Sequence, residues 1–138
     1  MSFATVTTIQ PNLLGGTIVH IEADVTRGLH AFSIVGLPGK AIEEAKDRVH
    51  SAIKYSDLPA PKSQNHKIII SLAPADLKKE GPLFDLPIAL AYLAATESIK
   101  LGQTAGRLFL GELALDGSLR GVRGVRGMRR RHGAALEV

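Results

Sequence analysis

The sequence predicts an α+β domain in which two main helices pack on one face of a mixed β-sheet. Residues 17–25 alternate between apolar and polar side chains, which is typical of a strand with one buried face. Residues 40–55 carry apolar side chains at helical spacing, and residues 85–96 form a second helix that is apolar on nearly every side. With 138 residues, 45% of them hydrophobic, the chain suits one compact core.

Strand signals dominate the first third of the chain. The strand over residues 17–25 is expected to expose its polar side chains to solvent. Residues 26–28 then favour a turn into a second strand over residues 29–35. We expect these two strands to pair with each other as an antiparallel hairpin.

The first helix is expected to run from Lys40 to Tyr55. Its acidic residues lie early and Lys54 lies late, an order that favours the helix dipole. The expected buried stripe consists of Ile42, Ala45, Val49, Ala52 and Ile53. The charged residues, Arg48 among them, are expected on the opposite, solvated face.

A proline-containing connection at residues 57–61 ends the helix. Residues 67–72 include three consecutive isoleucines and predict a central strand that is covered on both faces. A loop at residues 74–82 follows, and Asp85 is expected to cap the second helix. Strands at 107–115 and 118–122 are expected to pair around Asp116-Gly117 in a type I′ turn.

Two motifs in the second half of the chain identify a family. A charged loop punctuated by Gly-Pro runs into the apolar helix over residues 78–90, and a strand with an Asp-Gly hairpin follows at 109–119. Together they resemble the catalytic-core region of Lon-type protease domains. They resemble still more closely the N-terminal domain of the magnesium-chelatase-like AAA+ ATPases of the ComM (YifB) family. Further blocks that fit this pattern are residues 4–6, 32–38, 43–49, 69–79 and 123–125.

The resemblance implies a ribosomal S5 domain 2-like sandwich, but the protease residues are replaced. Leu83 follows Gly81-Pro82 where Lon-type domains carry the nucleophilic serine. Arg126 stands approximately where those domains carry the lysine that acts as general base, and arginine stays protonated at physiological pH. We therefore expect no catalytic residue, and a degenerate active-site loop formed by Lys78, Lys79, Glu80, Gly81, Pro82, Leu83 and Asp85.

Two interpretations of this loop are open. Lys78, Lys79, Glu80 and Asp85 are candidates for a retained surface or structural role. Alternatively, Asp85 merely caps the helix and both lysines are solvated.

The net charge of +4 is concentrated near the end of the chain. Residues 120–131 contain six arginines and no acid, while the rest of the chain has 11 basic and 13 acidic residues. We divide the chain into a domain at 1–125 and a basic tail at 126–138 that is either disordered or foreign to the natural sequence. The arginines could contact nucleic-acid phosphates; they are Arg120, Arg123, Arg126, Arg129, Arg130 and Arg131.

No cofactor or metal is expected in the chain itself. Residues 36–41 imitate a phosphate loop, but Ile34 and Ala41 stand where Walker A needs a glycine and a hydroxyl. The five histidines lack zinc-ligand spacing, and no cysteine occurs. The longest apolar runs are too short to span a membrane.

The resemblance implies a non-catalytic accessory domain of a ComM-type ATPase that acts in DNA processing, branch migration and natural transformation. The longer parent would bind ATP and magnesium, form a homohexameric ring and work in the cytoplasm. The expected partners are its own AAA+ module, its ring neighbours and DNA, with no membrane. Two alternatives are a residual Lon-like peptidase that uses a displaced hydroxyl and a stand-alone nucleic-acid-binding module.

Overall fold

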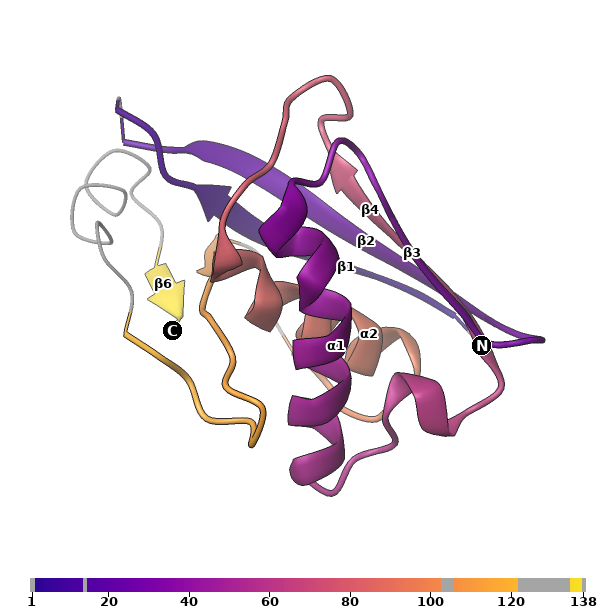
Figure 1. The fold of residues 1–138 in the computed structure, drawn as a ribbon. Helices are drawn as coiled ribbons and strands as arrows, with labels where there is room; N and C mark the ends of the chain where they lie inside the picture. The colour runs from indigo at the N-terminus through magenta and orange to yellow at the C-terminus, as the bar shows by residue number, and fades with distance from the viewer. Residues whose placement is uncertain (1, 14, 103–105, 122–134, 138) are drawn as a thin grey trace.

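The computed structural model describes residues 2–13, 15–102, 106–121 and 135–137 (Figure 1). Its main strands are β1 (Phe3–Gln10), β2 (Thr17–Arg27), β3 (Ala31–Val35) and β4 (His66–Ala73). Its helices are α1 (Lys40–Tyr55) and α2 (Asp85–Ala95), with short 3-10 helices η1 (Pro61–Ser63) and η2 (Pro82–Phe84). Strands β5 (Arg107–Phe109) and β6 (Ala135–Glu137) form a separate parallel pair.

The main sheet has the strand order β1-β2-β4-β3 and is mixed. Strand β2 pairs antiparallel with β1 and β4, whereas β3 pairs parallel with β4. The predicted hairpin between residues 17–25 and 29–35 is therefore wrong, because β4 lies between these segments. Helix α1 supplies the long crossover that a parallel pair requires. The Gly28 N–H donates to the Asn65 carbonyl oxygen at 3.1 Å, which ties the β2–β3 turn to the start of β4.

One face of the sheet is covered by the helices and the other is largely open. In β2, the odd-numbered side chains from Val19 to Val25 are buried, while His20 and Asp24 are exposed as expected. In β4, Ile68 is buried but Ile69 is only half-buried. The expectation that β4 is covered on both faces is wrong. Both helices pack on the same face of the sheet (Figure 1). The other face is exposed or half-buried over most of its length, except near the end of β1, where Ile9 is buried in a second apolar cluster with Leu108 and Leu110.

The two helices agree closely with the sequence pattern. Helix α1 has the predicted bounds, and its buried residues are the five predicted for the apolar stripe. Helix α2 is buried on most sides because it packs against β1, β2 and α1. One hydrophobic core joins both helices to the covered face of the sheet. The predicted α+β class, with a mixed sheet and two main helices, is confirmed.

The predicted C-terminal hairpin is much shorter than expected. Within the described residues, its pairing is reduced to one antiparallel bridge between Leu113 and Leu119. The Ala114 N–H donates to the Ser118 carbonyl oxygen at 2.9 Å, which closes a three-residue loop. Only Gly117 in this loop has a positive φ, of 92°. A type I′ turn needs positive φ at both central residues, so that prediction is wrong.

The predicted basic tail falls mostly outside the described residues. Arg126, Arg129, Arg130 and Arg131 of the tail, and Arg123 before it, lie outside the described residues, so their expected nucleic-acid contacts stay predictions. Within the tail, the structure describes the backbone of β6 beside β5. Among the described residues, no helix is long and apolar enough to cross a membrane.

Candidate functional site

The degenerate active-site loop connects the end of β4 to α2, and β1 holds it in place. The Gln10 side-chain amide donates to the Lys78 carbonyl oxygen at 3.1 Å. Its Oε1 accepts the Glu80 backbone N–H at 2.7 Å. Both hydrogen-bonding groups of one side chain are thus used to fix the loop backbone. Lys78 and Glu80 themselves are exposed, and their charged groups lie 3.5 Å apart.

Lys79 behaves in the opposite way to Lys78, because its side chain is fully buried. Its Nζ donates to the carbonyl oxygen of Gly36 at 2.8 Å and to that of Pro74. Its backbone N–H donates to Leu37 at 3.0 Å, and its carbonyl accepts the Gly39 N–H at 2.7 Å. Burial lowers the pKa of Lys79. The expectation of solvated lysines is confirmed for Lys78 and is wrong for Lys79.

These contacts explain the glycines of the segment that imitates a phosphate loop. Gly36 has a φ of 100°, and a Cβ there would lie 2.2 Å from the Leu72 carbonyl oxygen. A Cβ on Gly39 would lie 3.0 Å from the Lys79 carbonyl oxygen. Both glycines therefore allow backbone segments to approach closely.

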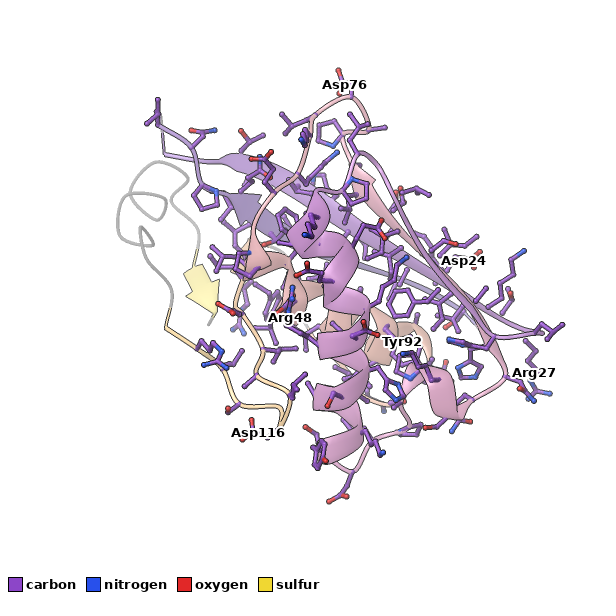
Figure 2. All side chains as sticks on the ribbon, in the orientation of Figure 1. Asp24, Arg27, Arg48, Asp76, Tyr92 and Asp116 are labelled. Carbon is purple, nitrogen blue, oxygen red and sulfur yellow. The ribbon has the colours of Figure 1, made fainter. Side chains whose placement is uncertain are left out.

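Asp85 is fully buried and forms an ion pair with Arg48 of α1. The Arg48 Nε donates to Asp85 Oδ2 at 2.8 Å and its Nη2 donates to Oδ1 at 3.0 Å. The Leu113 backbone N–H also donates to Oδ2, at 3.1 Å. A second bond from Arg48 Nη2 reaches the Ala41 carbonyl oxygen at 2.6 Å. One carboxylate thus ties α1, α2 and the segment after β5 together, and Figure 2 shows Arg48 on α1.

The predicted capping role of Asp85 is wrong. The helix N-cap is Phe84, without a side-chain hydrogen bond, and Asp85 is the first residue of α2. Burial raises the pKa of the Asp85 carboxyl, and the hydrogen bonds from Arg48 and Leu113 oppose this. The hydrogen bond to Asp85 raises the pKa of Arg48. The expectation of Arg48 on the solvated face is wrong. Arg48 lies three residues after Ala45 and four before Ala52, so helical spacing places it at the border of the buried stripe.

A hollow of about 430 Å³ lies beside the loop. Its lining residues are Gln10, Pro11, Glu80, Gly81, Pro82 and Leu83. Leu83 also packs against the apolar cluster of Ile9, Leu108 and Leu110. The described lining therefore offers no hydroxyl, thiol or imidazole, the groups that commonly serve as nucleophile or base.

Other predicted or conceivable site residues lie apart from this hollow. The Ser118 hydroxyl donates to Asp116 at 2.7 Å in the exposed hairpin loop. Arg120 is exposed, with its Nε 3.7 Å from Glu112. Within the described part of the chain, no group of three or more potential ligands is placed to hold a metal ion.

Comparison with known proteins gives a consistent family. The family model described as subunit ChlI of Mg-chelatase matches residues 21–134. The uncharacterized protein YifB of Salmonella typhimurium is 45% identical over 124 residues, which cover 90% of this chain and 24% of that protein. Competence protein ComM of Haemophilus influenzae is 45% identical over 108 residues, covering 78% of this chain and 21% of ComM. Escherichia coli YifB is 47% identical over 106 residues, covering 77% and 20%.

The chain thus spans about a quarter or less of the length of these curated relatives. The family match extends over most of this chain and includes the degenerate loop and its Arg48–Asp85 pair. The chain belongs to the family of the ChlI subunit of Mg-chelatase, with YifB and ComM among its relatives.

Proposed function

We propose that this chain is a non-catalytic accessory domain of a longer magnesium-chelatase-like AAA+ ATPase that processes DNA. Support comes from the relatives, which are several times longer than the aligned segment, and from the competence protein among them. Branch migration during natural transformation is the proposed process. The finer fold assignment that accompanies this proposal is the S5 domain 2-like sandwich.

The state of the degenerate loop carries the proposal. Its two buried ionisable side chains, Lys79 and Asp85, are engaged by carbonyl groups and by Arg48 respectively. The hollow beside it is lined by Leu83 where a Lon-type domain would present its nucleophile. The loop therefore works as a structural joint between the sheet and the two helices, and it leaves catalysis to another part of the parent protein.

In this proposal ATP and magnesium bind only to the AAA+ module of the parent. The accessory domain contacts that module and neighbouring subunits of a homohexameric ring, and it contributes to DNA contact in the cytoplasm. Such a role needs a stable domain. The buried hydrogen bonds of Lys79 and the Arg48–Asp85 ion pair help to provide this stability.

The test compares the isolated chain with the longer protein encoded at its locus. Sequencing beyond codon 138 should reveal an in-frame Walker A motif. The isolated chain should hydrolyse neither ATP nor casein, whereas the longer protein should hydrolyse ATP. Deletion of this domain should impair ring assembly or branch migration while ATP hydrolysis persists. ATP hydrolysis by the isolated chain would contradict the proposal. Unchanged ring assembly and unchanged branch migration after the deletion would also contradict it.

A further inference from the structure

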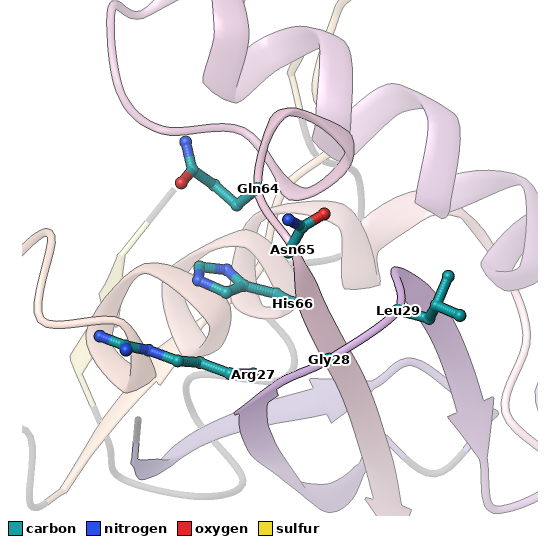
Figure 3. A pocket seen from close by; sticks show the side chains of 6 residues that line it. All are labelled: Arg27, Gly28, Leu29, Gln64, Asn65 and His66. Atoms are coloured by element: carbon teal, nitrogen blue, oxygen red, sulfur yellow. The ribbon is translucent and has the colours of Figure 1, made fainter.

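A second hollow, of about 700 Å³, lies at the end of the sheet opposite the degenerate loop. It forms where β2 ends and β4 begins. Its lining residues are Arg27, Gly28, Leu29, Gln64, Asn65 and His66 (Figure 3). The volume lies within the range typical of pockets for small organic ligands.

Hydrogen-bond donors gather on one side of this hollow. Figure 3 shows the side chains of Arg27, Gln64 and His66 extending to the same side of the β4 start. Arg27 and His66 are Cα partners across the β2–β4 pairing, which explains why the two side chains are neighbours. The Arg27 guanidinium carries only donors, and the Gln64 amide adds two more.

The buried His66 ring is oriented by a second residue of the core. Its Nδ1 lies 3.1 Å from the hydroxyl of Tyr92, which is itself fully buried. A neutral ring that accepts the tyrosine proton at Nδ1 carries its own hydrogen on Nε2. Among the described residues, the ring hydrogen bond of His66 is the one at Nδ1, and Nε2 is not one of the fully buried atoms that lack a partner. The Tyr92 contact therefore leaves an N–H donor available at the hollow.

Arg27 carries the one permanent charge among the described residues that line the hollow. None of the six lining residues is Asp or Glu. Burial is the largest cause that lowers the pKa of His66, and the charges of Arg27 and His30 lower it further. His30 comes close because its Nδ1 lies 3.2 Å from the His66 carbonyl oxygen.

We propose that this hollow binds the phosphate group of a nucleotide or of a nucleic-acid strand. Arg27 supplies a planar fork that matches phosphate oxygens, and His66 Nε2 and the Gln64 amide supply further donors. The hollow exceeds the size of a phosphate, so the attached sugar or base has room within it. This inference rests on the hollow alone and is independent of the proposed accessory function.

The experiment follows the side-chain NMR signals of Arg27 and His66 in the full chain. The probes are inorganic phosphate, thymidine 5′-monophosphate and a short oligothymidylate, with thymidine as the probe without phosphate. We expect saturable shifts of both residues with the phosphate-bearing probes and none with thymidine. Tighter binding of the monophosphate identifies a free nucleotide as the source, and tighter binding of the oligomer identifies a strand.

Two variants make the assignment specific. Arg27 is exposed, so Arg27→Gln should retain the native amide spectrum and weaken phosphate binding by about tenfold or more. Lys40→Gln is the matched control, because it removes one positive charge from the exposed start of α1, beyond the opposite end of the sheet. It should change the affinity less than about twofold. Equal effects of the two variants, equal shifts with thymidine, or no shift at Arg27 and His66 would overturn the proposal.

Discussion

Replacement of Asp85 by alanine tests whether the buried ion pair holds the two helices together. The substitution removes both hydrogen bonds from Arg48 and the one from the Leu113 N–H. Loss of one partner from a buried pair costs about 3–5 kcal/mol. Arg48 remains 21% exposed and lies 3.7 Å from Glu44, so part of its charge stays compensated. We therefore expect the lower end of this range, about 3 kcal/mol.

Urea unfolding followed by circular dichroism measures this change in the free energy of unfolding. Helix capping alone would cost only about 1 kcal/mol, so the two roles of Asp85 give separable values. Glu43→Ala is the matched control, because it breaks an ion pair to Lys46 on the exposed face of α1. That change should cost less than about 0.5 kcal/mol.

A double-mutant cycle separates the pair from other effects of the substitution. Arg48→Met combined with Asp85→Leu removes both charges and leaves apolar side chains of similar size. The double variant should be more stable than the sum of the two single changes predicts, by about 1–3 kcal/mol. A loss near 1 kcal/mol for Asp85→Ala, together with strict additivity in the cycle, would refute the ion-pair account.

Three further predictions concern other parts of the fold. Lys79→Met should cost about 1–3 kcal/mol in urea unfolding, because two carbonyls lose their donor, whereas exposed Lys78→Met should change stability by less than about 0.5 kcal/mol. Gly36→Ala should prevent soluble expression or lower the melting temperature sharply, since its φ is positive and its Cβ would meet the Leu72 carbonyl at 2.2 Å; Gly121→Ala, with open space at its Cβ and no positive φ, is the control. Burial raises the pKa of Tyr92 to about 12, whereas the unfolded chain keeps the ordinary tyrosine pKa of 10.0. As pH rises above 10.0, the unfolded chain therefore loses this proton first. The free energy of unfolding should then fall as pH rises from 10 to 12, and Tyr92→Phe should show a shallower fall.

Local patterns predicted the elements of this fold better than their pairing. The 3.6-residue spacing in α1 identified its bounds and its buried stripe, because both depend on residues close in sequence. The place of β4 between β2 and β3 depends on contacts between distant segments, and adjacency in sequence pointed to the wrong pairing. The three isoleucines of β4 indicated a central strand correctly, but its covered faces depend on where both helices pack.

In the candidate site too, local sequence features were predictable and contacts between distant segments were not. The motif around residues 78–85 predicted the loop between β4 and α2, whereas the replacement of a Lon-type nucleophile by Leu83 stays a prediction. The burial of Lys79 could not be predicted, since its two side-chain acceptors, Gly36 and Pro74, belong to different loops. The pairing of Asp85 with Arg48 joins residues 37 positions apart, and Asp85 at a helix start suggests a cap equally well.

The central claim is that this loop is a structural joint without peptidase chemistry. Fluorophosphonate labelling and casein turnover, measured on the wild-type chain and on Leu83→Ser, test it most directly. Among the described residues lining the adjacent hollow, the only ionisable side chain is Glu80, whose charge is paired with Lys78. Neither protein should be labelled or cleave casein, because the resemblance puts Arg126, which cannot accept a proton, in place of the general-base lysine of Lon-type domains. Labelling or turnover by either protein that disappears when one hydroxyl residue is replaced would contradict the account.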